Sequence, residues 1–182
     1  MGVHPRRLVT SVFCDLSGST SLTEKIDPEA AYSVIRSYFD EARQAFEQHG
    51  GTIEKFIGDA VVATFGLPEE RDDDAVRACR AALDIQGRMG RLNEELGHRF
   101  RAGIAVRIGV STGDVVGGDG APVLGEAVTF AARLERAASP GEVLIAEQTR
   151  VFAGDAVTVE PVERPSGGDP LVAFRLVGAE LA

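Results

Sequence analysis

The order of apolar segments along this chain predicts an α+β fold with a ferredoxin-like βαββαβ core and a small C-terminal α/β extension. Short β-rich runs alternate with long segments of helical periodicity, and two of the short runs stand only three residues apart. That spacing favours a hairpin over a crossover. One long helical segment precedes the hairpin and another follows it, which is the element order of a split βαβ sheet. The length of 182 residues is typical of one domain, residues 1–182.

The first strand and the first long helix are the clearest elements. Leu8–Cys14 is an apolar, β-rich run that ends at Asp15, and Leu16–Thr20 is a Gly/Ser turn leading into a helix. A long helix begins at Asp27-Pro28, a capping residue followed by a proline in the first turn, and stops at Gly50-Gly51. Its apolar residues form one stripe at helical spacing: Ala31, Val34, Ile35, Tyr38, Phe39, Ala42 and Phe46.

The hairpin comes next. Strands Thr52–Phe56 and Ala60–Phe65 are joined by the tight turn Ile57–Asp59. The acidic loop Pro68–Asp74 caps a second long helix, which begins at Ala75. We expect the first strand in the middle of the sheet, beside the strand that follows the first helix.

The rest of the chain supplies the last core strand and the extension. A long strand is predicted over Arg101–Val116, then a turn at Gly117–Pro122 and a third helix over Leu124–Ala138. The extension contains a strand, a short helix and two weak strands, at Val143–Ile145, Glu147–Phe152, Val157–Val162 and Leu171–Val177.

Composition excludes several functions. Nineteen Lys and Arg residues against twenty-eight Asp and Glu residues give a net charge of −9, and an acidic surface repels phosphate polymers, so we expect no nucleic-acid partner. No apolar run reaches the ~18 residues of a membrane span, and no signal peptide is visible at the start. The predicted location is cytoplasmic. Cys14 and Cys79 are interpreted as small core residues.

Two aspartates form the candidate functional site. Asp15 ends the first strand and Asp59 lies in the hairpin turn, so the predicted sheet brings them together at one edge. Two close carboxylates repel and favour a cation between them, and oxygen ligands suit Mg²⁺ or Mn²⁺. Amides of the loop Leu16, Ser17, Gly18, Ser19 and Thr20 can point at phosphate oxygens. The alternative is structural: Asp15 as a helix cap and Asp59 as a turn residue.

The sequence around these residues resembles the catalytic domain of class III nucleotidyl cyclases. The resemblance is carried in order by VFCDLSGST (12–20), GTIEKFIGDA (51–60), RIGVSTG (107–113) and GEAVTFAARLE (125–135). It covers about residues 8–150 and identifies the chain as a cyclase-homology catalytic domain, whereas the last thirty residues match poorly.

The resemblance implies a head-to-tail homodimer with a nucleoside triphosphate, ATP being favoured, at the interface. It implies that Asp15, Asp59 and the Leu16 carbonyl hold two Mg²⁺ or Mn²⁺ ions beside the 16–20 loop. The product would be a 3′,5′-cyclic nucleotide, cyclic AMP from ATP, with pyrophosphate.

The resemblance also implies roles for three basic residues. Lys55 would contact the base from the other protomer, Arg133 would stabilise charge growing on the α-phosphate, and Arg107 would lie near the β- and γ-phosphates. Taken by themselves, Lys55 and Arg133 are better explained as ordinary surface residues.

Three positions depart from the family pattern. Thr129 stands where an asparagine usually binds the ribose, and Pro122 stands where an Asp or Thr usually selects the base. Asp119 is an alternative partner for the base, because the register of that loop is open. In the tail, Arg164 is the only substitute for a phosphate-binding lysine. The competing hypothesis is therefore a weakly active or inactive cyclase-homology module that binds nucleotide or dimerises for signal relay, with relaxed base specificity as an intermediate case.

Overall fold

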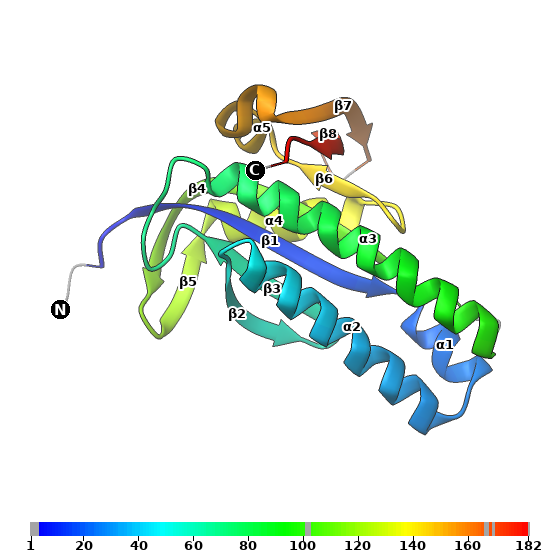
Figure 1. The fold of residues 1–182 in the computed structure, drawn as a ribbon. Helices are drawn as coiled ribbons and strands as arrows, with labels where there is room; N and C mark the ends of the chain where they lie inside the picture. The colour runs from blue at the N-terminus through cyan, green and yellow to red at the C-terminus, as the bar shows by residue number, and fades with distance from the viewer. Residues whose placement is uncertain (1–3, 101–102, 166–167, 169, 182) are drawn as a thin grey trace.

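The computed structural model describes residues 4–100, 103–165, 168 and 170–181. Within these residues the strands form one eight-stranded sheet in the order β2-β3-β1-β4-β6-β8-β7, with β5 paired to β4 (Figure 1). The strands are β1 (Arg7–Ser17), β2 (Thr52–Ile57), β3 (Ala60–Phe65), β4 (Ala105–Gly118), β5 (Ala121–Gly125), β6 (Val143–Ile145), β7 (Val157–Arg164) and β8 (Leu171–Ala179). The helices are α1 (Ser19–Lys25), α2 (Pro28–Gln48), α3 (Asp74–Phe100), α4 (Glu126–Ala137) and α5 (Glu147–Ala153), followed by a short 3₁₀ turn, η1 (Gly154–Ala156).

The core of the sheet has the predicted ferredoxin-like topology. Strands β4, β1, β3 and β2 are neighbours in that order and each pairs antiparallel with the next. The α+β fold class is thus confirmed. The expected neighbour of β1 is wrong, however: β3, the second strand of the hairpin, pairs with β1, and β2 lies at the edge. The reason is that β3 is the more apolar strand and five of its six residues are buried, so it takes the interior place.

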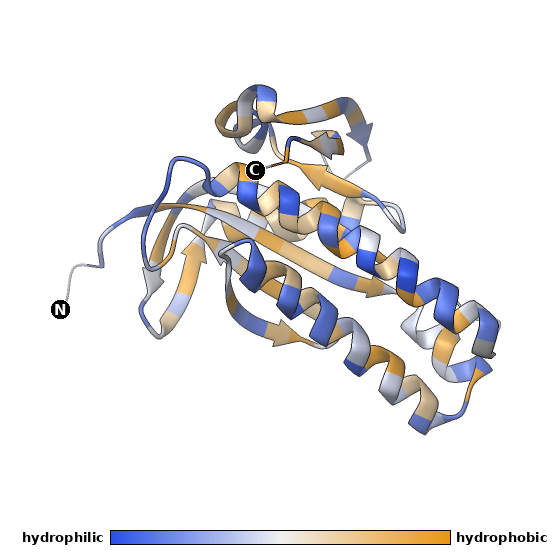
Figure 2. Ribbon diagram, viewed as in Figure 1, coloured by the Kyte–Doolittle hydropathy of each residue, from blue (hydrophilic) through white to orange (hydrophobic). Residues whose placement is uncertain are grey.

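Helices α2 and α3 pack side by side on one face of the sheet (Figure 1). The Asp27 carboxylate accepts a hydrogen bond of 3.0 Å from the Ala30 amide and so caps α2. Both helices turn an apolar stripe to the sheet and a charged face outward (Figure 2). Tyr38 and Phe46 of α2 are completely buried, and burial of such a side chain contributes roughly 1.5–3 kcal/mol.

The structure differs from the sequence prediction around residues 117–126. The predicted turn is shorter, because β4 continues to Gly118 and β5 begins at Ala121, so the two strands form a hairpin. Helix α4 begins at Glu126 rather than Leu124. At Gly117 the backbone has a φ of 106°, and a Cβ atom would lie 1.9 Å from the Pro122 carbonyl oxygen, so only glycine fits this turn.

The C-terminal strands continue the same sheet. β6 pairs parallel with β4, β8 pairs antiparallel with β6, and β7 forms the far edge. Helix α3 runs on to Phe100, further than its apolar pattern indicates, and the predicted strand start at Arg101 lies outside the described residues. The two longest helices are amphipathic, and none of the helices within the described residues meets the length and hydropathy of a bilayer-crossing segment.

Candidate active site

The sheet brings Asp15 and Asp59 to the same end. Asp15 lies opposite Ala60 of β3 on one side and opposite Arg107 of β4 on the other. Asp59 directly precedes Ala60, and its backbone carbonyl accepts a hydrogen bond of 3.4 Å from the Leu16 amide. Antiparallel pairing therefore holds two residues that are 44 positions apart in the sequence at the same end of the sheet.

A buried tyrosine of α2 forms a hydrogen bond to this end of the sheet. The buried Tyr38 hydroxyl donates a hydrogen bond of 3.0 Å to the Cys14 carbonyl oxygen, one residue before Asp15. Burial raises the pKa of Tyr38 well above its usual value, and the charges of Asp15 and Asp59 both add to that rise. Cys14 is buried, and its burial raises the pKa of the thiol to about 12, as expected for an inert core residue.

The loop 16–20 is positioned beside the second aspartate. Leu16 and Ser17 end β1, Gly18 takes a left-handed conformation with a φ of 90°, and Ser19 and Thr20 begin α1. The Ser19 hydroxyl donates a hydrogen bond of 2.6 Å to an Asp59 carboxylate oxygen. This bond orients Asp59 without neutralising its charge, so the carboxylate remains a possible metal ligand.

Arg107 lies on the other side of Asp15, where it joins two carboxylates. Its Nη2 atom is 3.0 Å from an Asp15 oxygen and 3.2 Å from a Glu135 oxygen. Glu135 comes from α4, and its side chain is only 8% exposed. Burial, followed by the Asp15 carboxylate, raises the pKa of Glu135 to about 7 against the opposing charge of Arg107. In the structure Arg107 therefore has an acidic partner on each of two neighbouring elements.

Sequence reasoning missed Glu135. It ends the 125–135 segment of the family resemblance, but no role is assigned to it there. Its place in the α4 stripe was the available signal, because it follows the buried Leu134 and lies four residues after the buried Ala131. A glutamate facing the sheet needs a cationic partner, and Arg107 is that partner.

The donors at this end of the sheet fit a divalent metal. Asp15 of β1 and Asp59 of the β2–β3 turn lie at the same end of the sheet, and no group of three or more His, Cys, Asp or Glu side chains suited to a metal occurs in the described part of the chain. Mg²⁺ is commonly held by one or two carboxylates, with waters and substrate phosphates completing its six oxygen ligands. Asp15, Asp59 and the Leu16 carbonyl match that incomplete, phosphate-dependent type of site.

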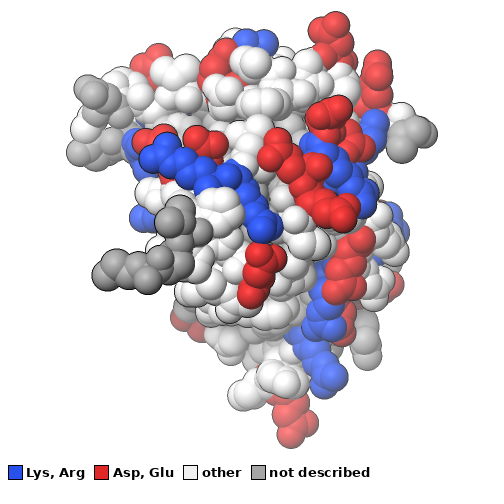
Figure 3. Space-filling view, turned by 90° about the vertical axis from the view of Figure 1, so that its left-hand side faces the viewer, with Lys and Arg blue, Asp and Glu red and all other residues white. Residues whose placement is uncertain are grey.

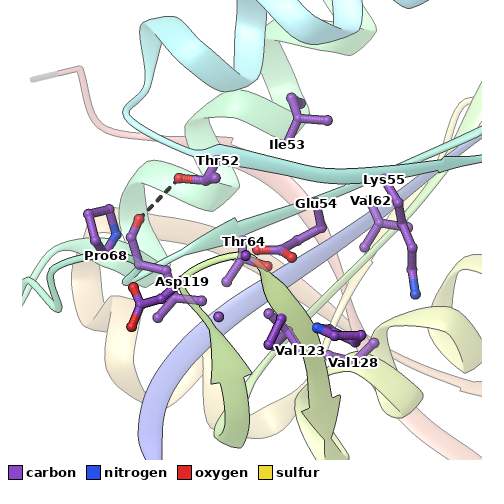
Figure 4. A pocket seen from close by; sticks show the side chains of 15 residues that line it. Thr52, Ile53, Glu54, Lys55, Val62, Thr64, Pro68, Asp119, Val123 and Val128 are labelled. Carbon is purple, nitrogen blue, oxygen red and sulfur yellow. Dashed lines mark hydrogen bonds between the residues drawn. The ribbon is translucent and has the colours of Figure 1, made fainter.

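A cavity of about 510 Å³ contains the residues expected to meet the base. Lys55 of β2 lines it (Figure 4), and so does Pro122 of β5. Asp119, the alternative partner for the base, also lines the cavity, but its carboxylate forms a 3.0 Å ion pair with Arg7. The structure thus brings Lys55 and Pro122 together.

Thr129 and Arg133 lie elsewhere, in a second cavity of about 490 Å³. The two cavities have no lining residue in common. The Thr129 hydroxyl donates a 3.3 Å hydrogen bond to the Gly125 carbonyl of its own helix. The Arg133 guanidinium lies 5.4 Å from the centre of the Phe130 ring and lines the cavity from α4. The described chain therefore presents the predicted site residues in three separate groups.

Arg164 forms an ion pair within the fold. Its Nη2 atom lies 2.8 Å from an oxygen of Glu142, whose side chain is 7% exposed. Arg175 binds the same carboxylate at 2.7 Å. Arg164 therefore ties β7 to the loop after α4.

The surface in Figure 3 carries Lys and Arg side chains beside Asp and Glu side chains. Such mixed charge differs from the basic stripe that a phosphate polymer requires. The absence of a nucleic-acid partner stays a prediction.

Comparison with known proteins identifies the family. A model of the adenylate and guanylate cyclase catalytic domain matches residues 2–163, and the chain belongs to this family. An adenylate cyclase from Anabaena cylindrica is 32% identical over 146 residues, which cover 74% of this chain and 28% of that protein.

Two solved structures agree with this assignment. The adenylyl cyclase CyaB from P. aeruginosa is 26% identical with a TM-score of 0.87, and the match covers 98% of each chain. The guanylyl cyclase Cya2 is 31% identical with a TM-score of 0.86, covering 99% of this chain and 96% of that one. The chain spans 15% to 28% of the length of the first three curated relatives that it matches.

Proposed function

We propose that this domain converts a nucleoside triphosphate, ATP in the first place, into its 3′,5′-cyclic monophosphate and pyrophosphate at the interface of a homodimer. The convergence of Asp15 and Asp59 at one end of the sheet carries the proposal. Cyclase relatives of both base specificities support the reaction class, and ATP is proposed first because Lys55 matches the base-contacting lysine that the family resemblance implies.

In the reaction the ribose 3′-oxygen forms a bond to the α-phosphorus while the bond from that phosphorus to the pyrophosphate oxygen breaks. The 3′-hydroxyl gives up its proton to solvent water, and pyrophosphate leaves with the electron pair of the broken bond. Two Mg²⁺ or Mn²⁺ ions held by Asp15, Asp59 and the Leu16 carbonyl would supply activation of the 3′-hydroxyl and neutralisation of the triphosphate charge.

The chain's own side chains bind and orient the substrate. Arg133 stabilises the charge that grows on the α-phosphate, a contribution typically of a few kcal/mol. Arg107 and the amides of residues 17–20 bind the distal phosphates. Thr129 positions the ribose through its hydroxyl, and Lys55 donates a hydrogen bond to the base.

A second copy of the chain is needed to complete this constellation. The Asp15 and Asp59 end, the Lys55 cavity and the Arg133 cavity are separate within one protomer. Large apolar side chains are exposed on β2 and on the β4–β5 hairpin: Phe56, Ile57, Val116 and Leu124 are 48%, 50%, 39% and 61% exposed. An apolar surface of this kind is typical of an interface. A head-to-tail pair would bury it and bring the groups of one protomer to those of the other.

The experiment is direct. Purified protein with Mn²⁺ is incubated with each of the four nucleoside triphosphates, and cyclic products are separated by chromatography. We expect cyclic AMP from ATP and no product from Asp59→Ala protein. No cyclic product from any of the four substrates at high protein concentration would overturn the proposal.

That outcome would favour a weakly active or inactive module that relays signals by dimerising or binding nucleotide. Two observations favour this second candidate. Pro122 brings no polar side-chain atom to the cavity that it lines, and the Thr129 hydroxyl is bound within its own helix.

A further inference from the structure

We propose that Glu54, supported by Thr64, recognises the exocyclic amino group of the nucleotide base in place of the polar side chain that Pro122 lacks. This inference rests on the proposed function, because it assigns the base to the cavity lined by Lys55 and Pro122.

A β-bulge on β2 turns Glu54 toward that cavity. Ile53 pairs with Ala63 and Lys55 pairs with Val62, so Glu54 is an extra residue without a partner on β3. In a regular strand neighbouring side chains point to opposite faces, whereas a bulge re-aims one of them. Here Glu54 and Lys55, which are adjacent in the sequence, both line the same cavity (Figure 4).

Thr64 of β3 lies under Glu54 and is completely buried. Its hydroxyl completes no hydrogen bond of ordinary geometry with the described residues, although Glu54 points toward it (Figure 4). The nearby Thr52 differs, because its hydroxyl donates a 3.0 Å hydrogen bond to the Leu67 carbonyl. The Thr64 hydroxyl is nevertheless near enough to the Glu54 carboxylate to favour its charged form, so it supports Glu54 as an acceptor at the cavity wall.

The other residues that line the cavity offer few polar groups that could bind to Glu54 in place of a ligand. It is largely apolar, with side chains of Ile53, Val62, Leu67, Pro68, Pro122, Val123 and Val128. Asp119 is held by Arg7. Burial raises the pKa of Glu54, opposed by the Thr64 hydroxyl and by Lys55, so the carboxylate gains from any donor that enters the cavity.

The chemistry selects an amino-substituted base. A carboxylate only accepts hydrogen bonds and an ammonium only donates them. Adenine offers its 6-amino group as donor and ring N1 as acceptor, and guanine offers its 2-amino group and N1–H as donors and O6 as acceptor. Both match the Glu54 and Lys55 pair through an amino group. A base analogue without that amino group leaves Glu54 unpaired and should bind worse.

The test compares triphosphates that differ by one amino group. ATP is compared with purine riboside triphosphate, and GTP with inosine triphosphate, by kcat/KM and, separately, by the dissociation constant from calorimetry. Wild-type protein should prefer the amino-bearing member of its preferred pair by about tenfold or more, as expected for a hydrogen bond to a charged group. The pair that shows the larger ratio identifies the base.

Four variants locate the effect. Glu54→Met removes the acceptor at similar length and should bring the ratio to about one, while Thr64→Val should lower it about threefold, in line with a neutral hydrogen bond. Glu94→Gln, an exposed glutamate on α3, is the matched control and should leave the ratio unchanged. Circular dichroism checks folding, and Glu54→Gln, the most conservative change, should give an intermediate ratio if Glu54→Met does not fold.

The outcomes separate the two proposals. Cyclisation by wild type with an unchanged ratio in a folded Glu54→Met or Glu54→Gln variant would overturn this inference and leave the proposed function standing. No cyclisation, but a binding ratio that depends on Glu54, would overturn the function and support the inference. A wild-type protein that neither cyclises nor binds any of these nucleotides would overturn both.

Discussion

The aspartate end of the sheet and the cavity on β2 are built in opposite ways. At the aspartate end, Asp15 is paired with Arg107, Arg107 with Glu135, and Asp59 with Ser19. In the cavity, Glu54 is a bulge residue without a partner on β3, and its carboxylate has only the neighbouring Thr64 hydroxyl and Lys55 to favour its charge. The difference is that the aspartate end carries ion pairs between elements, whereas the Glu54 carboxylate of the cavity has no ion pair of that kind; under the proposed function, the first would bind phosphates and the second the base.

Removal of an aspartate carboxylate is expected to cause the largest loss of activity, and it tests the aspartate end of the sheet. Asp15→Asn or Asp59→Asn should reduce cyclic nucleotide formation by about a thousandfold or more, because a neutral amide binds a divalent cation weakly. Turnover with Mn²⁺ is the measurement, and Asp155→Asn, an exposed residue in η1, is the control. Activity within tenfold of wild type in either variant would contradict a metal role for these carboxylates.

Complementation is the next test, because it asks whether Asp15, at the aspartate end, and Arg133, in the cavity on α4, act from different protomers. Asp15→Ala and Arg133→Ala should each be inactive alone. When equal amounts are mixed, half of the dimers are mixed and one of their two sites is intact, so activity should return to about a quarter of wild type. Size-exclusion chromatography confirms that the variants associate. Co-dimerisation without recovery would show that the site is not shared.

Substitution of Glu135 tests whether its ion pair with Arg107 helps to position the aspartate end of the sheet. Glu135→Gln removes the charge that holds Arg107 beside Asp15, and we expect a ten- to hundredfold loss of activity with weaker Mn²⁺ binding. The readout is the Mn²⁺ concentration at half-maximal activity, which a purely structural role would leave unchanged. Arg136→Gln, an exposed neighbour on α4, serves as the control. An unaltered Mn²⁺ dependence would remove Glu135 from the site.

Substitution of Thr129 is expected to give the smallest change in activity, and it tests how the ribose is bound. Thr129→Asn supplies an amide that can reach beyond the helix, where the present hydroxyl bonds to Gly125. We expect a rise of about three- to tenfold in kcat/KM, the value of one added hydrogen bond. Steady-state kinetics with ATP and Mn²⁺ measure it. A decrease would indicate that the threonine is already the better fit for this cavity.

Local patterns in the sequence determine the elements and part of the site. Helical periodicity, the Asp27-Pro28 start and the 57–59 turn are short-range signals, and each produces the expected element. The convergence of Asp15 and Asp59 also follows, because antiparallel pairing of known strands leaves few places for their ends. The roles of Lys55 and Arg133 stay predictions from the family motifs, because periodicity alone does not distinguish these residues from surface residues.

Tertiary structure decided the rest, because it depends on which strands pair and in what register. The position of β3 beside β1, the hairpin of β4 with β5, and the bulge at Glu54 arise from contacts between distant segments. Glu135 meets Arg107 only because α4 packs over β1 and β4. Sequence determines which residues favour strand or helix, whereas the packing of those elements decides which charged groups meet.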